Sequence, residues 1–248
     1  MQQEKSRYYL IDGIRGLAIV NMVVFHTLYD VFIVYGRDPG WYSQPETHVW
    51  QQFICWTFIL VSGLVWPYGR SKNLRRGLII NALGLVISLA TLIATPGQVV
   101  WFGILNFIGC AILLMFPLEK LSLKLPVRWA LPLCFLLFLL FRHVDQGYIG
   151  ITGLFTLPLP RAMYSLRILA PLGFPDPGFF SSDYFPILPW MFLYLCGFQL
   201  NRLFMRQGPW QKLGRVKLPG LSYLGTKSIW VYMLHQPIIM LACLLILG

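Results

Sequence analysis

The chain has 248 residues, of which 57% are hydrophobic and 12% are charged, and its formal net charge is +11. A soluble domain is typically about 45–50% apolar and about 25% charged, so this composition excludes an ordinary soluble protein and predicts a polytopic membrane protein. In such a protein, positive charge marks loops that face the cytoplasm, and we therefore expect no nucleic-acid partner.

About seven stretches are long and apolar enough to cross a bilayer, because a transmembrane helix needs about 20 mostly apolar residues. In chain order they cover residues 11–35, 50–68, 77–95, 99–117, 127–141, 185–203 and 226–247. They predict an all-α polytopic helical bundle that forms a single domain over residues 1–248 and is surrounded by the lipid bilayer.

The basic residues of the loops alternate along the chain. Lys and Arg are in excess before the first stretch and in the second, fourth and sixth loops, and the second loop holds Arg70, Lys72, Arg75 and Arg76. Basic loops tend to stay on the cytoplasmic side of a membrane. We therefore expect the N-terminus in the cytoplasm and the C-terminus outside.

The fifth loop, residues 142–184, is rich in Pro, Gly and aromatic residues and is too apolar for a solvated linker. Irregular backbone at membrane depth is stable only where protein buries it or where it lines a water-filled cavity. We expect this loop to form a cap or a re-entrant segment on the outer face.

The first stretch carries four ionisable residues, although each such residue costs several kcal/mol at membrane depth. On an α-helix, Arg15 and His26 point about 20° apart around the axis, while Asp12–Arg15 and His26–Asp30 have the spacing of contacting pairs. These four residues form a polar stripe that joins one membrane surface to the interior. The opposite face is apolar and holds Leu17, Val20 and Val24.

The polar stripe has the residue types of an acid–base site. His26 is suited to the role of general base, with Asp30 accepting a hydrogen bond from one ring nitrogen and raising the basicity of the other. Alternatively, His26 is a core histidine satisfied by a neighbouring helix. The second-loop residues Arg70, Arg75 and Arg76 are either a topology signal or a phosphate-binding cluster, since Arg binds phosphate in a bidentate manner.

Other polar residues within the apolar stretches are candidates for binding or for helix packing. His235 lies midway along the last stretch, where it either faces His26 or serves packing, and Asn106 could bridge helices. The glycines of IDGIRG and VSG predict close helix approach. The cysteines form no CxxC pair, so we expect neither a disulfide framework nor a metal site.

Several sequence blocks resemble a known family. DGIRGLAIVNMVVFH resembles the first-helix motif of membrane acyltransferases, in which Asp-x-x-Arg-Gly precedes a His. With FILVSG, WFGILNFIG, DYFPILPWMFLYLCG and SIWVYMLHQPII, it resembles the successive blocks of the bacterial relatives of heparan-α-glucosaminide N-acetyltransferase. These blocks follow the family order over nearly the whole chain, although Asn106 stands where many bacterial relatives have a His.

The resemblance implies an integral acetyltransferase of the bacterial cytoplasmic membrane. Its donor would be cytoplasmic acetyl-CoA, and its acceptor an amino sugar or a sugar hydroxyl on a glycan or lipid-linked sugar at the outer face. Carried over by position, His26 is the catalytic His of the first-helix motif, and Asp12 and Arg15 are the acid and base of that motif. With Asp30, which its spacing suggests as the group that orients His26, they make up the expected catalytic residues. Arg15, Arg70, Arg75 and Arg76 are expected to bind the cofactor, and Asn106, Asp183, Trp190 and His235 the acceptor.

Two other functions remain open from the residues alone. A transporter or flippase for a lipid-linked or anionic solute would use the polar stripe as its pathway, but no internal repeat is visible. A non-catalytic membrane scaffold is the third hypothesis. The sequence also leaves a homodimer open.

Overall fold

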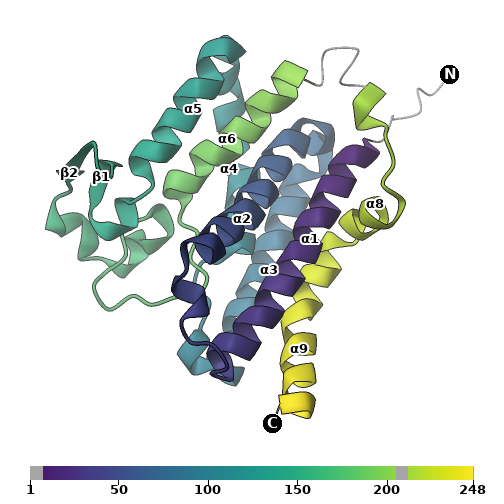
Figure 1. Cartoon of the computed structure of the whole chain (residues 1–248). Coiled ribbons are helices and arrows are strands. Elements are labelled where there is room, and N and C mark those ends of the chain that lie inside the picture. The colour runs from purple at the N-terminus through teal and green to yellow at the C-terminus, as the bar shows by residue number, and fades with distance from the viewer. Residues whose placement is uncertain (1–7, 205–211, 248) are drawn as a thin grey trace. The chain divides into compact units, whose positions relative to one another are not determined.

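The computed structural model describes residues 8–204 and 212–247, and most of these residues are helical (Figure 1). The helices are α1 (Tyr9–Tyr29), α2 (Pro45–Val65), α3 (Asn73–Ala94), α4 (Ile104–Lys124), α5 (Val127–Phe141), α6 (Ile187–Phe204), α8 (Pro219–Thr226) and α9 (Ser228–Leu247). In the same residues, β1 (Tyr148–Ile151) and β2 (Phe155–Pro158) form a two-stranded antiparallel hairpin. The predicted all-α polytopic fold is confirmed.

Five helical stretches of the described residues are long and apolar enough to cross a membrane. They are Tyr9–Val34, Pro45–Ala94, Ile104–Lys124, Val127–Gln146 and Ser228–Leu247. The second of these contains both α2 and α3, and α6 is not among the five. The number of spans and the orientation of the chain stay predictions.

Residue contacts divide the chain into two compact units. The first unit comprises Met1–Val61 and Phe204–Gly248, and the second comprises Ser62–Leu203. The single domain that we expect from the sequence stays a prediction.

The first unit is built around α1, which α8 and α9 flank in Figure 1. Its core contains the buried residues Ile19, Met22, Phe25 and Ile54, and the half-buried Trp41 and Trp50 pack against them. The three aliphatic residues predicted to face away from the polar stripe are exposed, with exposed fractions of 43% for Leu17, 40% for Val20 and 45% for Val24. Such a face suits contact with lipid.

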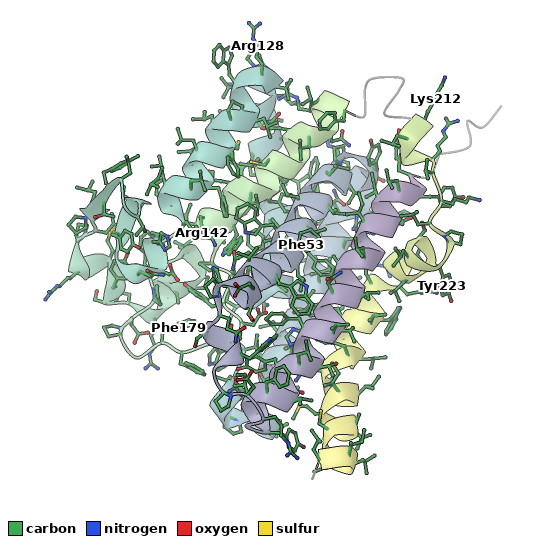
Figure 2. All side chains as sticks on the ribbon, in the orientation of Figure 1. Phe53, Arg128, Arg142, Phe179, Lys212 and Tyr223 are labelled. Carbon is green, nitrogen blue, oxygen red and sulfur yellow. The ribbon has the colours of Figure 1, made fainter. Side chains whose placement is uncertain are left out.

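Helix α8 approaches α1 so closely that the glycines at the contact are required. A Cβ atom on Gly16 would lie 2.0 Å from the carbonyl oxygen of Leu221, and one on Gly225 would lie 1.8 Å from that of Asp12. The Ser222 hydroxyl donates a hydrogen bond of 2.9 Å to the Tyr9 carbonyl across the same contact. Tyr223, labelled in Figure 2, is 67% exposed. The close helix approach predicted from IDGIRG is confirmed.

The second unit has an aromatic core. Trp66 is 1% exposed, and its indole N–H donates a 3.0 Å hydrogen bond to the Ile112 carbonyl of α4. The predicted fifth loop folds onto the same unit: its β-hairpin contacts α5, and the hydroxyls of Tyr164 and Tyr184 donate hydrogen bonds to the backbone carbonyls of Val144 and Ala170. The position of this loop at the outer face stays a prediction.

Several helix boundaries differ from those expected, and one helix was not expected. Helix α2 begins at Pro45 rather than residue 50, because proline fits the first turn of a helix. Helix α4 begins at Ile104 rather than residue 99, because Val99 and Trp101 form hydrogen bonds with Ser182 and Ser181 instead. Helix α8 lies in the stretch predicted as a loop, where packing against α1 stabilises a short helix.

Candidate functional site

The polar stripe lies on one continuous helix up to His26. Asp12, Arg15 and His26 are all part of α1, and the Arg15 guanidinium lies 3.3 Å from the Asp12 carboxylate. Both side chains are mostly buried, with exposed fractions of 22% for Arg15 and 13% for Asp12. The predicted Asp12–Arg15 contact is confirmed, and it reduces the cost of placing either charge in the bundle.

The helix widens one turn after His26. Residues Asp30–Val34 form a π-helical turn, in which the Tyr35 backbone N–H donates a 2.9 Å hydrogen bond to the Asp30 carbonyl. Isolated π-turns occur frequently at functional sites. Here the turn begins at a carboxylate that is only 2% exposed.

The partner of the Asp30 carboxylate is Gln236 rather than His26. The Gln236 side-chain amide donates hydrogen bonds of 3.1 and 3.0 Å to the two Asp30 carboxylate oxygens. Among the hydrogen bonds of the described residues, none joins Asp30 to the His26 ring. The catalytic role of Asp30 stays a prediction, but the structure does not support direct orientation of His26.

His26 instead faces the second histidine of the apolar stretches. The rings of His26 on α1 and His235 on α9 have centroids 4.9 Å apart, with an interplanar angle of 60°. The structure therefore favours the expectation that His235 faces His26. Because these two residues lie far apart in the sequence, α1 and α9 must pack together to form the pair.

One tautomer of His235 is fixed by the backbone. Its Nδ1 atom lies 2.6 Å from the Tyr232 carbonyl oxygen. A carbonyl can only accept, so Nδ1 carries the hydrogen and Nε2 carries a lone pair. Within residues 8–204 and 212–247, this Nε2 atom is buried and has no hydrogen-bond partner, and the same holds for Oε1 of Gln236. A ligand that brings N–H or O–H donors would satisfy both atoms.

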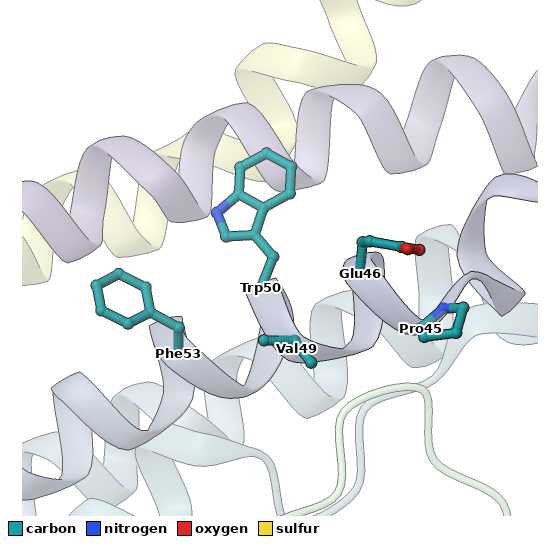
Figure 3. Close-up of a pocket in the computed structure, with 5 residues that line it drawn as sticks. All are labelled: Pro45, Glu46, Val49, Trp50 and Phe53. Atoms are coloured by element: carbon teal, nitrogen blue, oxygen red, sulfur yellow. The ribbon is translucent and has the colours of Figure 1, made fainter.

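Aromatic residues pack around Phe25, whose ring centroid lies 6.1 Å from that of His26. Phe25, next to His26, packs against Trp41 and Trp50 with both centroid distances at 5.4 Å. Figure 3 shows Trp50 directed from α2 toward α1, where its indole N–H donates a 2.9 Å hydrogen bond to the Asn21 side chain. Beside it lies a shallow hollow lined by Pro45, Glu46, Val49, Trp50 and Phe53.

The predicted phosphate-binding residues belong to the second unit and differ in their partners. Arg70 forms a 2.8 Å ion pair with Glu119, which is 8% exposed. Arg76 donates a 3.3 Å hydrogen bond to the side chain of Asn73. Arg75 is exposed. The guanidinium groups of Arg75 and Arg76 are therefore better suited than that of Arg70 to an external anion.

The predicted acceptor-binding residues of the second unit all have local partners. The Asn106 amide donates to the Asn81 carbonyl at 3.4 Å, and the Trp190 ring packs 4.9 Å from that of Phe185. The Asp183 carboxylate accepts a 3.3 Å hydrogen bond from the Ile104 backbone N–H at the start of α4. Burial raises the pKa of Asp183 to about 6, and the hydrogen bond from Ile104 opposes this rise only in part. These contacts explain structural roles, and acceptor binding by the three residues stays a prediction.

Gln236 was not among the residues predicted from sequence. A glutamine carries no charge and no catalytic group, so it gives no signal of its own. The available hint was its place beside His235 in the block YMLHQP.

Comparisons with known proteins identify the family. The family model described as heparan-alpha-glucosaminide N-acetyltransferase, catalytic, matches residues 7–237. No curated protein and no solved structure matches the chain. The match includes the polar stripe, the basic second loop and the His235–Gln236 pair. The chain therefore belongs to the heparan-alpha-glucosaminide N-acetyltransferase catalytic family and is an integral-membrane acetyltransferase.

Proposed function

We propose that the protein transfers an acetyl group from cytoplasmic acetyl-CoA to a glycan or lipid-linked sugar at the outer face of a bacterial cytoplasmic membrane. The observation that supports this proposal best is the facing pair His26 and His235 on two apolar helices. Two imidazoles supply proton acceptors at a depth where ionisable groups mark function. The family match supplies the reaction class.

In the proposed reaction, His26 is the general base. The acceptor's nitrogen or oxygen attacks the acetyl carbon, and its proton passes to the His26 ring. The bond between the acetyl carbon and the CoA sulfur breaks, and the sulfur then takes up the proton as the thiol. Positioned acid–base groups contribute about 10²–10⁴-fold to such a rate.

The charged residues supply binding in this proposal. Arg75 and Arg76 hold phosphate groups of acetyl-CoA through charge-assisted hydrogen bonds. Arg70 contributes less, because Glu119 already neutralises it. Arg15, held by Asp12, binds the donor from within the bundle.

The two facing histidines of the first unit favour an amine over a hydroxyl as the group that is acetylated. His235 Nε2 lacks a donor among the described residues, and His26 takes a proton from the attacking group in the proposed reaction. A neutral amine has two N–H donors, one for each of these rings, whereas a hydroxyl has one O–H. We therefore propose an amino sugar as the preferred acceptor.

The test is acetyl transfer by the purified protein in detergent. Labelled acetyl-CoA is offered with oligosaccharides that end in glucosamine, and with matched oligosaccharides that end in glucose. We expect transfer to the amine, loss of transfer in His26→Gln, and near-normal transfer in the control His143→Gln, whose ring stacks on Tyr148 in the second unit. Full activity of a folded His26→Gln protein would exclude His26 as the base.

A further inference from the structure

The buried Asp30 carboxylate is bound by an uncharged side chain rather than by a basic one. It is 2% exposed, and both of its oxygens accept hydrogen bonds from the uncharged amide of Gln236. A buried carboxylate without donors is strongly disfavoured. The amide therefore has a task that an apolar residue in the same place could not perform.

The position of this link relative to the histidines suggests what the task is. Asp30 follows His26 by one helical turn, and Gln236 directly follows His235. The link thus joins α1 to α9 within one turn of both rings, whose centroids lie 4.9 Å apart. Asp30 is also the first residue of the π-turn, so the hydrogen bonds from Gln236 hold the chain at the point where regular α-helix ends.

We propose that Gln236 is a positioning residue that sets the distance and orientation of the His26–His235 pair through Asp30, and that Asp30 acts here by position rather than as a catalytic group. Gln236 donates its hydrogen bonds to the Asp30 carboxylate, and these bonds hold α9 at a fixed height along α1. His235 has its ring orientation fixed by the Tyr232 carbonyl, so the height of α9 determines where Nε2 lies. This inference rests on the proposed acetyl transfer.

A swap of the two partners separates position from charge. Gln236→Met removes the amide but keeps the side-chain length, and Gln236→Glu places two carboxylates in contact. In the double variant Asp30→Asn with Gln236→Glu, the Asn amide donates to the Glu carboxylate. The donor and acceptor are then exchanged between the helices, while the total side-chain length and the net charge stay the same.

We expect Gln236→Met to lower kcat by about 10–100-fold, because a misplacement of about 1 Å can cost about 10²-fold. The apparent affinity for acetyl-CoA should stay within about twofold, since its phosphates bind elsewhere in the proposal. Gln236→Glu should be at least as impaired. The double variant should recover most of the wild-type kcat, which a general loss of stability would not allow.

Several outcomes would overturn this inference. One is a Gln236→Met protein with wild-type kcat, and another is a folded double variant as impaired as Gln236→Glu, which would show that the Asp30 carboxylate itself is needed. If Gln236→Met does not fold, the double variant alone decides. An inactive wild-type protein would refute the proposed function, whereas an active enzyme indifferent to Gln236→Met would refute only the role of Gln236.

Discussion

Replacing Gly16 by Ala should destabilise the protein through the contact between α1 and α8. The added Cβ would lie 2.0 Å from the Leu221 carbonyl oxygen and 2.8 Å from its carbon, whereas ordinary contacts begin near 3.4 Å. The obstructing atoms are backbone, so the two helices must move apart by roughly 1.4 Å along that direction. Overpacking of this kind costs about 1–3 kcal/mol and sometimes more.

The assay is thermal unfolding in detergent, with Gly220→Ala as the control. About 1 kcal/mol shifts the Tm of a chain of this size by roughly 2–4 °C, so Gly16→Ala should lower Tm by roughly 2–12 °C. Gly220 lies on the same helix α8 with open space around its Cβ position. Gly220→Ala should therefore keep or raise Tm, because Ala favours helix by about 1 kcal/mol. An unchanged Tm in Gly16→Ala would refute the tight contact.

The remaining predictions concern the donor, a buried carboxyl and the topology. Changing Arg75 and Arg76 together to Ala should raise the Kd for CoA, measured by thermal shift, more than it lowers kcat. The variant Arg70→Ala should have a smaller effect on this Kd, because Glu119 already neutralises Arg70. Equal effects of the two changes on the Kd would make the cluster a topology signal only. Asp183 has a pKa raised from 3.8 to about 6 in the folded protein. The folded state therefore binds the proton more tightly, so the stability that Asp183 contributes is greatest below pH 4 and is lost as the pH rises to 6. Asp183→Asn should remove this part of the pH dependence of Tm, and an unchanged profile would contradict the assignment. Single cysteines at Lys72 and Asp176 should react from opposite sides of the membrane, and labelling from one side would exclude the predicted topology.

The sequence predicted helices most accurately where local signals mark their ends. The predicted stretch 127–141 coincides with α5, Val127–Phe141, which follows Pro126 and ends before Arg142. The predicted start of α4 was wrong, because Ser181 and Ser182 form hydrogen bonds with the segment that precedes this helix. Such contacts leave no local pattern. Helix α8 was missed for the same reason. Its glycines are typical of a loop, and only the contact with α1 explains why they lie in a helix.

The candidate site divides in a similar way. Helical spacing was sufficient to place Asp12, Arg15 and His26 on one helix and to predict the Asp12–Arg15 contact. The same spacing suggested that Asp30 orients His26, but the side chain that binds Asp30 is Gln236, 206 positions away. Spacing within one helix cannot reveal a competing partner on another helix.

Helix α9 connects bilayer thickness to the site. It has 20 residues, so it is about 30 Å long, which equals the hydrocarbon thickness of a typical bilayer of about 30 Å. A thinner bilayer makes such a helix tilt, and a thicker one is itself compressed around it. Because α9 carries both His235 and Gln236, a change in its tilt moves the His235 ring and the Gln236 amide relative to His26. The acyl-chain length of the surrounding lipid is therefore a variable of the reaction, and turnover in vesicles should be greatest where the membrane and α9 match.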